Sequence, residues 1–221
     1  MEDKQGGVYG FLDPDVHMPE RFGFFKPPKN GEKPGATSYT LENTDPELYT
    51  TKYRAYHSTW KQSIGIPFGI SLLDVTGSKT YGIVLDFDKH YVKDKKKLLR
   101  SDKEMADYYG KLLPILQRFN FATEDSGGET GGYKSWMLFD EPTEVSGVLP
   151  FCSYLEKDFD DMGLEVFPRG GYWTRLPGLY KTRDRYSLVL HSSRLETGTE
   201  LNTFEKINEF FIGAKNDPDE F

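Results

Sequence analysis

The hydrophobic pattern is densest over residues 81–88, where β-prone apolar residues form a near-continuous run. Such a run is typical of a strand that is buried on both faces. Two acids close the run, Asp86 and Asp88, with one residue between them. Because residues i and i+2 of an extended chain project to the same side, the two carboxylates should point together, with Phe87 turned back into the core. Two like charges at the end of a buried strand favour a bound divalent cation, although an Asp at a strand end also caps turns and helices.

Hydrophobic periodicity elsewhere predicts helices and strands that alternate irregularly. Helices are expected from Asp45, from Ser101 with a capping box to Glu104, and over residues 149–162 and 201–211. Further strands are expected over residues 68–75, 119–123, 133–139, 164–167 and 186–191. The strands at 68–75 and 80–88 should form a hairpin. The irregular alternation predicts an α/β (α+β) fold with a mixed sheet.

The N-terminal part of the chain differs from the rest in composition. Residues 1–46 are rich in Gly and Pro, with scattered aromatics such as Phe11 and Phe22. This composition predicts an irregular arm that aromatic side chains anchor to the body, because a disordered tail would carry fewer of them. Residues 47–221 then form the main domain, and residues 215–221 at its end are expected to be frayed.

Composition and charge restrict the class of protein. The chain has 221 residues, a formal net charge of −7 and a single cysteine, Cys152. The negative charge argues against a protein that coats nucleic acid along its whole surface, but it leaves room for a local basic groove. A single cysteine excludes a disulfide within the chain and a cysteine-based zinc site. Because no apolar run reaches the length of a membrane span, an intracellular (cytoplasmic) protein without a membrane partner is expected.

Glycine and basic residues gather in separate segments. The loop at 126–132 is rich in Gly, which suits backbone N–H groups that hold phosphate but equally suits a flexible hairpin loop. Residues 89–100 are basic, either as a solvated surface or as a contact to polyphosphate or DNA. Residues 169–186 interleave cations with aromatic rings, as a surface that binds phosphates and stacks on bases requires.

Groups of residues follow one another in an order that resembles a known family. They are Asp86-Phe87-Asp88 on a strand, the segment from Ser126-Gly127 through Gly132 to Lys134-Ser135-Trp136, and Leu164-Glu165-Val166-Phe167-Pro168 followed by Arg175-Leu176-Pro177-Gly178. Across residues 65–195 this order resembles the archaeo-eukaryotic primase superfamily, in particular the primase-polymerase type found in phages, plasmids and other mobile elements. The Arg-Leu-Pro-Gly run is a mark of the mobile-element branch.

The resemblance implies a fold and an activity. The fold would have two lobes around one cleft, an N-terminal α/β part and a C-terminal part like an RNA-recognition motif. The activity would be that of a template-dependent DNA primase or polymerase, a nucleotidyltransferase that adds nucleotides from NTP or dNTP in the replication of a phage, plasmid or other mobile element. Its partners would be a single-stranded or primed DNA template and, in a longer protein, a helicase or another replication domain beyond residue 221.

The resemblance also implies site residues. Asp86, Asp88 and Glu165 would hold two divalent ions, Mg²⁺ or Mn²⁺, that activate a 3′-hydroxyl and neutralise the triphosphate. The nucleotide-binding residues would be Ser126, Gly127, Gly132, Lys134 and Arg175. The nucleic-acid-binding residues would be Trp173, Lys181, Arg183 and Arg185.

Departures from the family pattern keep other functions open. Lys134 stands where the family has His, and the loop before it is longer. A lysine binds phosphate as a point charge but cannot act as a neutral imidazole, so a catalytically altered nucleic-acid-binding relative is an alternative. A D-x-D glycosyltransferase would use Mn²⁺ at Asp86 and Asp88 but leaves the Gly-rich loop and the Arg-Leu-Pro-Gly run without a role. A haloacid-dehalogenase-type phosphatase ranks last, because it requires Thr or Val where this chain has His90.

Overall fold

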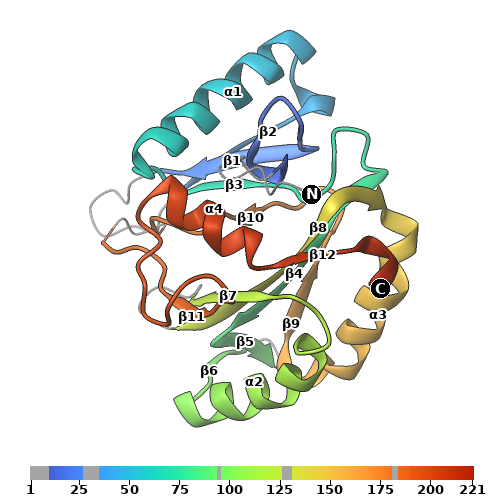
Figure 1. The fold of residues 1–221 in the computed structure, drawn as a ribbon, viewed down its shortest axis with the longest axis vertical. Coiled ribbons are helices and arrows are strands. Elements are labelled where there is room, and N and C mark those ends of the chain that lie inside the picture. The colour runs from blue at the N-terminus through green and yellow to red at the C-terminus, as the bar shows by residue number, and fades with distance from the viewer. Residues whose placement is uncertain (1–9, 27–34, 94–95, 126–130, 181–183) are drawn as a thin grey trace, which may run out of the picture.

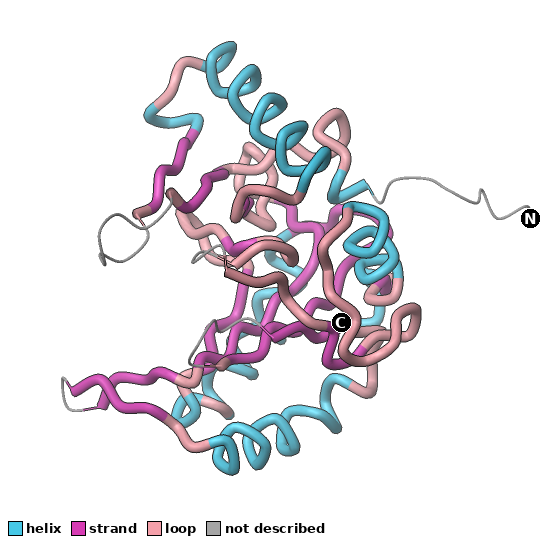
Figure 2. Tube along the Cα trace, turned by 90° about the vertical axis from the view of Figure 1, so that its left-hand side faces the viewer, coloured by secondary structure: helices cyan, strands magenta, loops and turns pink. Residues whose placement is uncertain are grey.

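The computed structural model describes residues 10–26, 35–93, 96–125, 131–180 and 184–221. Its strands are distributed over two main sheets and one hairpin. The first sheet is antiparallel and has the order β10-β3-β1-β2, with β1 (Arg21–Phe25), β2 (Ala36–Thr40), β3 (Phe68–Ile70) and β10 (Thr174–Arg175). The hairpin consists of β5 (His90–Lys93) and β6 (Lys96–Leu99), and Figure 2 shows it projecting from the rest of the chain.

The second sheet is the larger one and contains the strand that ends in Asp86 and Asp88. Its order is β11-β7-β8-β4-β9, and β12 adds to β8 in parallel while the other pairs are antiparallel. The strands are β4 (Lys79–Asp88), β7 (Ala122–Asp125), β8 (Gly132–Glu144), β9 (Leu164–Phe167), β11 (Val189–His191) and β12 (Lys215–Asn216). The predicted mixed sheet in an α/β (α+β) fold is therefore confirmed.

Helices cover both faces of the larger sheet. They are α1 (Pro46–Ser63), α2 (Asp102–Leu116), α3 (Val145–Asp158) and α4 (Phe204–Ile212), and short 3₁₀ turns lie at Gly10–Leu12, Leu41–Asn43, Asp160–Met162 and Pro218–Glu220. In Figure 1, α1 and the smaller sheet lie at one end of the molecule and α2 with the β5–β6 hairpin at the other, with the larger sheet between them. No helix in the described ranges is both long and apolar enough to cross a membrane.

The alternation along β4 divides the core into two clusters. Ile83, Leu85 and Phe87 point to one face, where they pack with apolar residues of α2 and α3. Val84 points to the opposite face and packs with Trp136 in the cluster that also holds apolar residues of α1 and α4. Because β4 is buried on both sides before it reaches Asp86, the predicted doubly buried strand and the inward Phe87 are confirmed.

Local capping rules explain where two helices begin. The Asp45 side chain accepts a hydrogen bond from the Leu48 N–H, at 3.0 Å, and Pro46 occupies the first turn of α1. Ser101 and Glu104 form the predicted capping box at the start of α2, since each side chain bonds the other residue's backbone N–H.

Pairing partners of several segments differ from the expectations. Residues 73–80 make the predicted tight turn, with a bridge between Leu73 and Thr80, but β3 and β4 enter different sheets because β3 pairs with β1 and β10. The strand predicted over 119–123 begins later, at Ala122, and the helix predicted over 149–162 runs instead over Val145–Asp158.

Both chain ends are more regular than expected. Residues 1–46 contain β1 and β2, because the prolines that argued against regular structure fall outside these strands. The predicted aromatic anchors are present, since Phe11 and Phe22 are fully buried. The expected fraying of residues 215–221 is wrong: Asn216 is buried in β12, and the Phe221 ring stacks on Phe119 with centroids 4.3 Å apart.

Candidate functional site

The register of the larger sheet places Asp86 between two charged residues. On β8 its direct partner is Lys134, and on β9 its direct partner is Glu165. Lys134 in turn lies opposite Glu124 of β7. Directly paired residues of antiparallel strands share a face of the sheet, with Cα atoms about 4.5–5.5 Å apart. Glu165, Asp86, Lys134 and Glu124 therefore form a continuous charged row across β9, β4, β8 and β7.

Solvent exposure decreases along the charged row. Glu165 is exposed, the Asp86 side chain is 19% exposed, the Lys134 side chain is 4% exposed and Glu124 is fully buried. Asp88 lies two residues beyond Asp86 on β4 and is also exposed. The row thus has an open, acidic outer end formed by Asp86, Asp88 and Glu165, and a closed inner end around Glu124.

Lys134 joins the two main sheets at this row. Its Nζ lies 3.1 Å from Oδ2 of Asp86 and donates a hydrogen bond of 3.4 Å to the carbonyl oxygen of Arg175. Arg175 belongs to β10 of the smaller sheet. The Lys134 ammonium therefore contacts a carboxylate of one sheet and a backbone carbonyl of the other.

Glu124 and Arg175 form a second, deeper charge pair. Arg175 Nη2 lies 3.7 Å from Glu124 Oε2, and Trp136 Nε1 donates to Glu124 Oε1 at 3.2 Å. Within the described part of the chain, neither Arg175 Nη2 nor Glu124 Oε2 has a hydrogen-bond partner. Burial raises the pKa of the Glu124 carboxyl, and the neighbouring Arg175 and Lys134 charges oppose that rise. Glu124 is not among the residues expected in the site, because it lies just beyond the strand expected over residues 119–123 and its burial depends on Arg175 from a distant segment.

Asp125 anchors the chain where β7 leads into the Gly-rich loop. Its Oδ1 accepts from the Leu188 N–H at 2.6 Å, its Oδ2 accepts from Arg185 Nη1 at 3.1 Å, and its carbonyl accepts from the Tyr180 hydroxyl at 2.6 Å. The guanidinium groups of Arg185 and Arg175 lie 4.5 and 4.8 Å from the centre of the Tyr180 ring. These contacts fix the end of β7 beside the charged row.

Two of the other residues expected in the site, Gly132 and Trp173, have defined neighbours in the structure. Gly132 is buried and pairs with Asp88 across β4 and β8. Trp173 packs against Phe25, with ring centroids 5.1 Å apart, and covers Gly69, so this ring has a structural contact besides any role with nucleic acid. Ser126, Gly127, Lys181 and Arg183 lie outside the described residues.

The outer end of the row offers oxygen ligands that suit a hard cation. Among the residues that the structure describes, no three His, Cys, Asp or Glu side chains are gathered as a ready-made metal cage. Mg²⁺ is usually held by one or two carboxylates together with substrate phosphates and water, so a preformed cage is not required. Asp86 and Glu165 on adjacent strands, with Asp88 beside them, fit such an open site.

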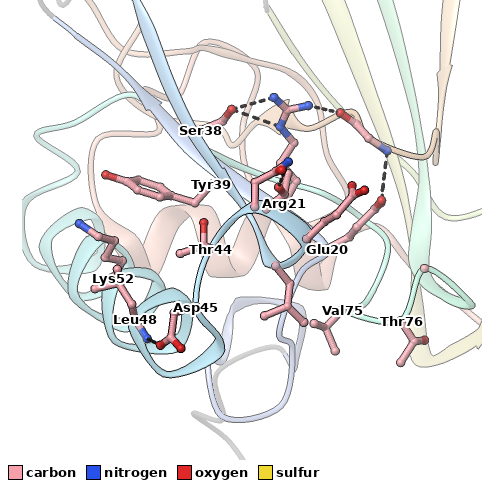
Figure 3. Close-up of a pocket in the computed structure, with 16 residues that line it drawn as sticks. Glu20, Arg21, Ser38, Tyr39, Thr44, Asp45, Leu48, Lys52, Val75 and Thr76 are labelled. Carbon is pink, nitrogen blue, oxygen red and sulfur yellow. Dashed lines mark hydrogen bonds between the residues drawn. The ribbon is translucent and has the colours of Figure 1, made fainter.

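An open hollow of about 1000 Å³ lies elsewhere in the molecule, between β2, the start of α1 and the turn before β4. Figure 3 shows Arg21 in this hollow bonded to Ser38 and to the backbone of Gly171. None of its lining residues belongs to the charged row. Both acidic and basic side chains line this hollow, so its charge does not indicate one class of ligand. The charged row is therefore the stronger candidate for a functional site.

Comparisons with known proteins show a distant likeness to a solved structure. No protein-family model matches the chain, and no curated protein sequence matches it. Among solved structures, the archaeo-eukaryotic primase (AEP) domain of the cyanophage S-2L primase-polymerase is similar over 86% of this chain and 88% of that domain. The sequence identity is 14% and the TM-score is 0.41. A likeness at this level does not assign the chain to a family.

Proposed function

We propose that this chain is a nucleotidyltransferase, the catalytic domain of a template-dependent DNA primase-polymerase. The observation that carries the proposal is the register that sets Asp86 directly between Glu165 and Lys134. It gathers carboxylates and a fixed cation from three separated sequence segments, near the ends of three neighbouring strands of one sheet. The substrates would be a single-stranded or primed DNA template and NTP or dNTP, in the replication of a phage, plasmid or other mobile element.

The outer end of the charged row would bind the divalent ions. Asp86, Asp88 and Glu165 would supply oxygen ligands to Mg²⁺ or Mn²⁺ from two adjacent strands. When bound, such ions activate the attacking hydroxyl and stabilise the charge on the transferring phosphoryl group. The exposure of Asp88 and Glu165 leaves this end accessible to a nucleotide and a primer terminus.

The chain's own cations would position the triphosphate. Lys134 is fixed between Asp86 and the Arg175 carbonyl, so its charge is preorganised and needs no rearrangement as the transition state forms. The Asp125 contacts would hold the end of β7 beside the same charged row. In the reaction, the primer 3′-hydroxyl would lose its proton to solvent as its oxygen bonds to the α-phosphorus, and the bond from that phosphorus to the leaving pyrophosphate would break.

A second candidate is a nucleic-acid-binding relative without catalysis. The Asp86–Lys134 ion pair favours this candidate, because it neutralises one of the proposed metal ligands. Arg185 and the partly exposed ring of Trp173 would then serve binding alone.

Primer extension combined with a binding assay separates the two candidates. The wild type is compared with Asp86→Ala plus Asp88→Ala, and with Asp107→Ala as a control for loss of an exposed acid on α2. The catalytic proposal expects extension by the wild type and by Asp107→Ala, and none by the double variant. Template binding without extension by any of the three proteins would favour the binding module, and absence of both would contradict the two candidates.

A further inference from the structure

The basic segment at residues 89–100 contains the β5–β6 hairpin, which begins two residues after Asp88. Six of these twelve residues are Lys or Arg and one is Asp, so the segment carries a net charge of +5 in a chain of net charge −7. Within the described ranges, β5 and β6 pair only with each other, and Figure 2 shows the hairpin projecting from the rest of the chain. The residues of the proposed catalytic site do not account for this concentration of positive charge.

The base of the hairpin is fixed beside the charged row. The Arg100 side chain is buried, and its Nη1 donates a hydrogen bond of 2.9 Å to the carbonyl oxygen of Asp88. The Arg100 N–H donates to the Lys89 carbonyl at 2.9 Å, and the Lys89 N–H donates to the Gly131 carbonyl at 3.4 Å. Lys89 also forms an ion pair with Asp102 at the start of α2. The hairpin therefore projects from a fixed point at the end of β4.

The register of the hairpin brings like charges together at its outer end. Lys93 of β5 is the direct partner of Lys96 of β6, and Lys97 follows opposite Val92. Like charges directly opposite each other destabilise a strand pair, and an isolated two-stranded hairpin is only marginally stable in water. A polyanion at the outer end would remove this repulsion, so the hairpin is better suited to a bound state than to free solution.

The length of the hairpin favours a DNA strand over a single nucleotide as that polyanion. A strand rises about 3.3 Å per residue, so Lys93 lies about 10 Å beyond His90 at the base. A nucleotide held at Asp86 and Asp88 would therefore lie at the base of the hairpin and not at its outer end. The phosphates of a DNA strand repeat about every 3.4 Å along the helix axis and would continue past the whole hairpin.

We propose that the β5–β6 hairpin binds the phosphate backbone of the DNA template through Lys93, Lys96 and Lys97. This inference rests on the proposed function insofar as it takes the ligand of the neighbouring site to be a DNA template. Contacts to phosphates position a strand without reading its sequence, and their strength decreases with salt. The hairpin would thus hold the template near Asp86 and Asp88 whatever its sequence.

The test is binding of a fluorescently labelled primed DNA template, measured by anisotropy in EDTA and without nucleotide. The triple variant Lys93→Gln, Lys96→Gln and Lys97→Gln should raise the Kd at least tenfold at about 100 mM salt, and the slope of log Kd against log salt should fall by about two to three. Its melting temperature without DNA should be no lower than that of the wild type, because the substitutions remove a repulsion. The corresponding triple Arg variant keeps the charge and should bind as the wild type does.

A matched control changes the net charge equally at exposed lysines of three helices. Lys61→Gln, Lys111→Gln and Lys157→Gln together should leave the Kd within about threefold of the wild type, because these residues lie on α1, α2 and α3. Equal Kd values and salt slopes for the wild type and the hairpin variant would overturn the inference, and so would an equal loss of affinity in the control or a wild type that does not bind the template.

Two further comparisons separate this inference from its neighbours. Any affinity for dATP alone, measured by isothermal titration calorimetry, should be the same in the wild type and the hairpin Gln variant. A variant that loses affinity for dATP but keeps it for DNA would overturn the inference. Because the DNA assay contains neither metal nor nucleotide, hairpin-dependent binding by a protein that fails in primer extension would contradict the proposed catalytic function and leave this inference standing.

Discussion

Asp86 and Glu165 are direct partners across β4 and β9, although 78 residues lie between them in the sequence. Asp86 is the less exposed of the two and also contacts Lys134. Glu165 is exposed and stands on the solvent side of the pair. Removal of the Glu165 carboxylate should therefore affect activity alone, whereas loss of the contact between Asp86 and Lys134 should also affect stability.

Glu165→Gln should reduce nucleotide incorporation by about 10²-fold or more, because it removes a charged oxygen ligand at the reacting centre. Its melting temperature should stay close to that of the wild type, because substitutions of exposed side chains are usually within about 0.5 kcal/mol. Glu141→Gln, at an exposed acid of β8, is the matched control and should keep its activity. Full activity in Glu165→Gln would exclude this residue from the site.

Lys134→Met should lower the free energy of unfolding by about 2–4 kcal/mol, because it leaves Asp86 and buried Glu124 without their common cation. Urea denaturation measures this loss. The double variant Asp86→Asn plus Lys134→Met should lose less than the sum of the two single variants, since the contact is shared. Strictly additive losses would mean that the two residues do not interact.

Stability should decrease as pH falls from about 6.5 toward 4, in part because of His17 and His57. Burial lowers the pKa of each imidazole to about 4, and Lys61 also lowers that of His57. Between this value and the unfolded value near 6.5 the unfolded chain binds more protons, so each histidine costs about 1.4 kcal/mol per pH unit in that window and nothing above it.

The difference between the wild type and His17→Gln isolates one of these contributions. The free energy of unfolding of His17→Gln, measured by urea denaturation from pH 4.5 to 7, should fall less steeply with acid by about 1 kcal/mol per pH unit. Equal slopes for the two proteins would show that His17 is not held neutral in the folded state.

Gly69→Ala should destabilise the protein, because an added Cβ would lie 2.2 Å from the Trp173 ring and 2.6 Å from the Thr174 carbonyl oxygen. Overpacking of this kind costs about 1–3 kcal/mol. Gly110→Ala on α2 is the matched control, because its added Cβ would meet nothing within 4 Å. This variant should raise the free energy of unfolding by about 0.5–1 kcal/mol. Thermal unfolding of both variants measures these changes in stability. A Gly69→Ala variant as stable as the wild type would contradict the packing of Trp173 on β3.

The sequence alone was sufficient to predict those structural features that depend on residues close together in the chain. The caps at Asp45 and Ser101 and the doubly buried β4 follow from local rules, and the structure has all of them. The pairing of Asp86 with Lys134 and Glu165 could be expected only through the resemblance to a family. Periodicity identifies strands but not which strands become neighbours.

The unexpected features depend on contacts between distant segments. Glu124 is buried because β7 pairs with β8 and because Arg175 of the other sheet contacts its carboxylate. The first strand, β1, exists because β2 and β3 pair with it, although its surroundings are rich in Gly and Pro. Asn216 is held in place because its side chain donates hydrogen bonds to the Asn120 and Leu138 carbonyls. The sequence around Asn216 does not predict these contacts, because both partners are distant in the chain.

Incorporation of a single labelled dNMP at a primer terminus tests the central claim most directly. The wild type in Mg²⁺ or Mn²⁺ should extend the primer by one nucleotide opposite the complementary template base, and chelation of the metal should stop the reaction. Asp86→Ala plus Asp88→Ala should give no product while still binding the primed template. Incorporation that persists in this double variant, or that continues without divalent metal, would contradict the assignment of the site to Asp86, Asp88 and Glu165.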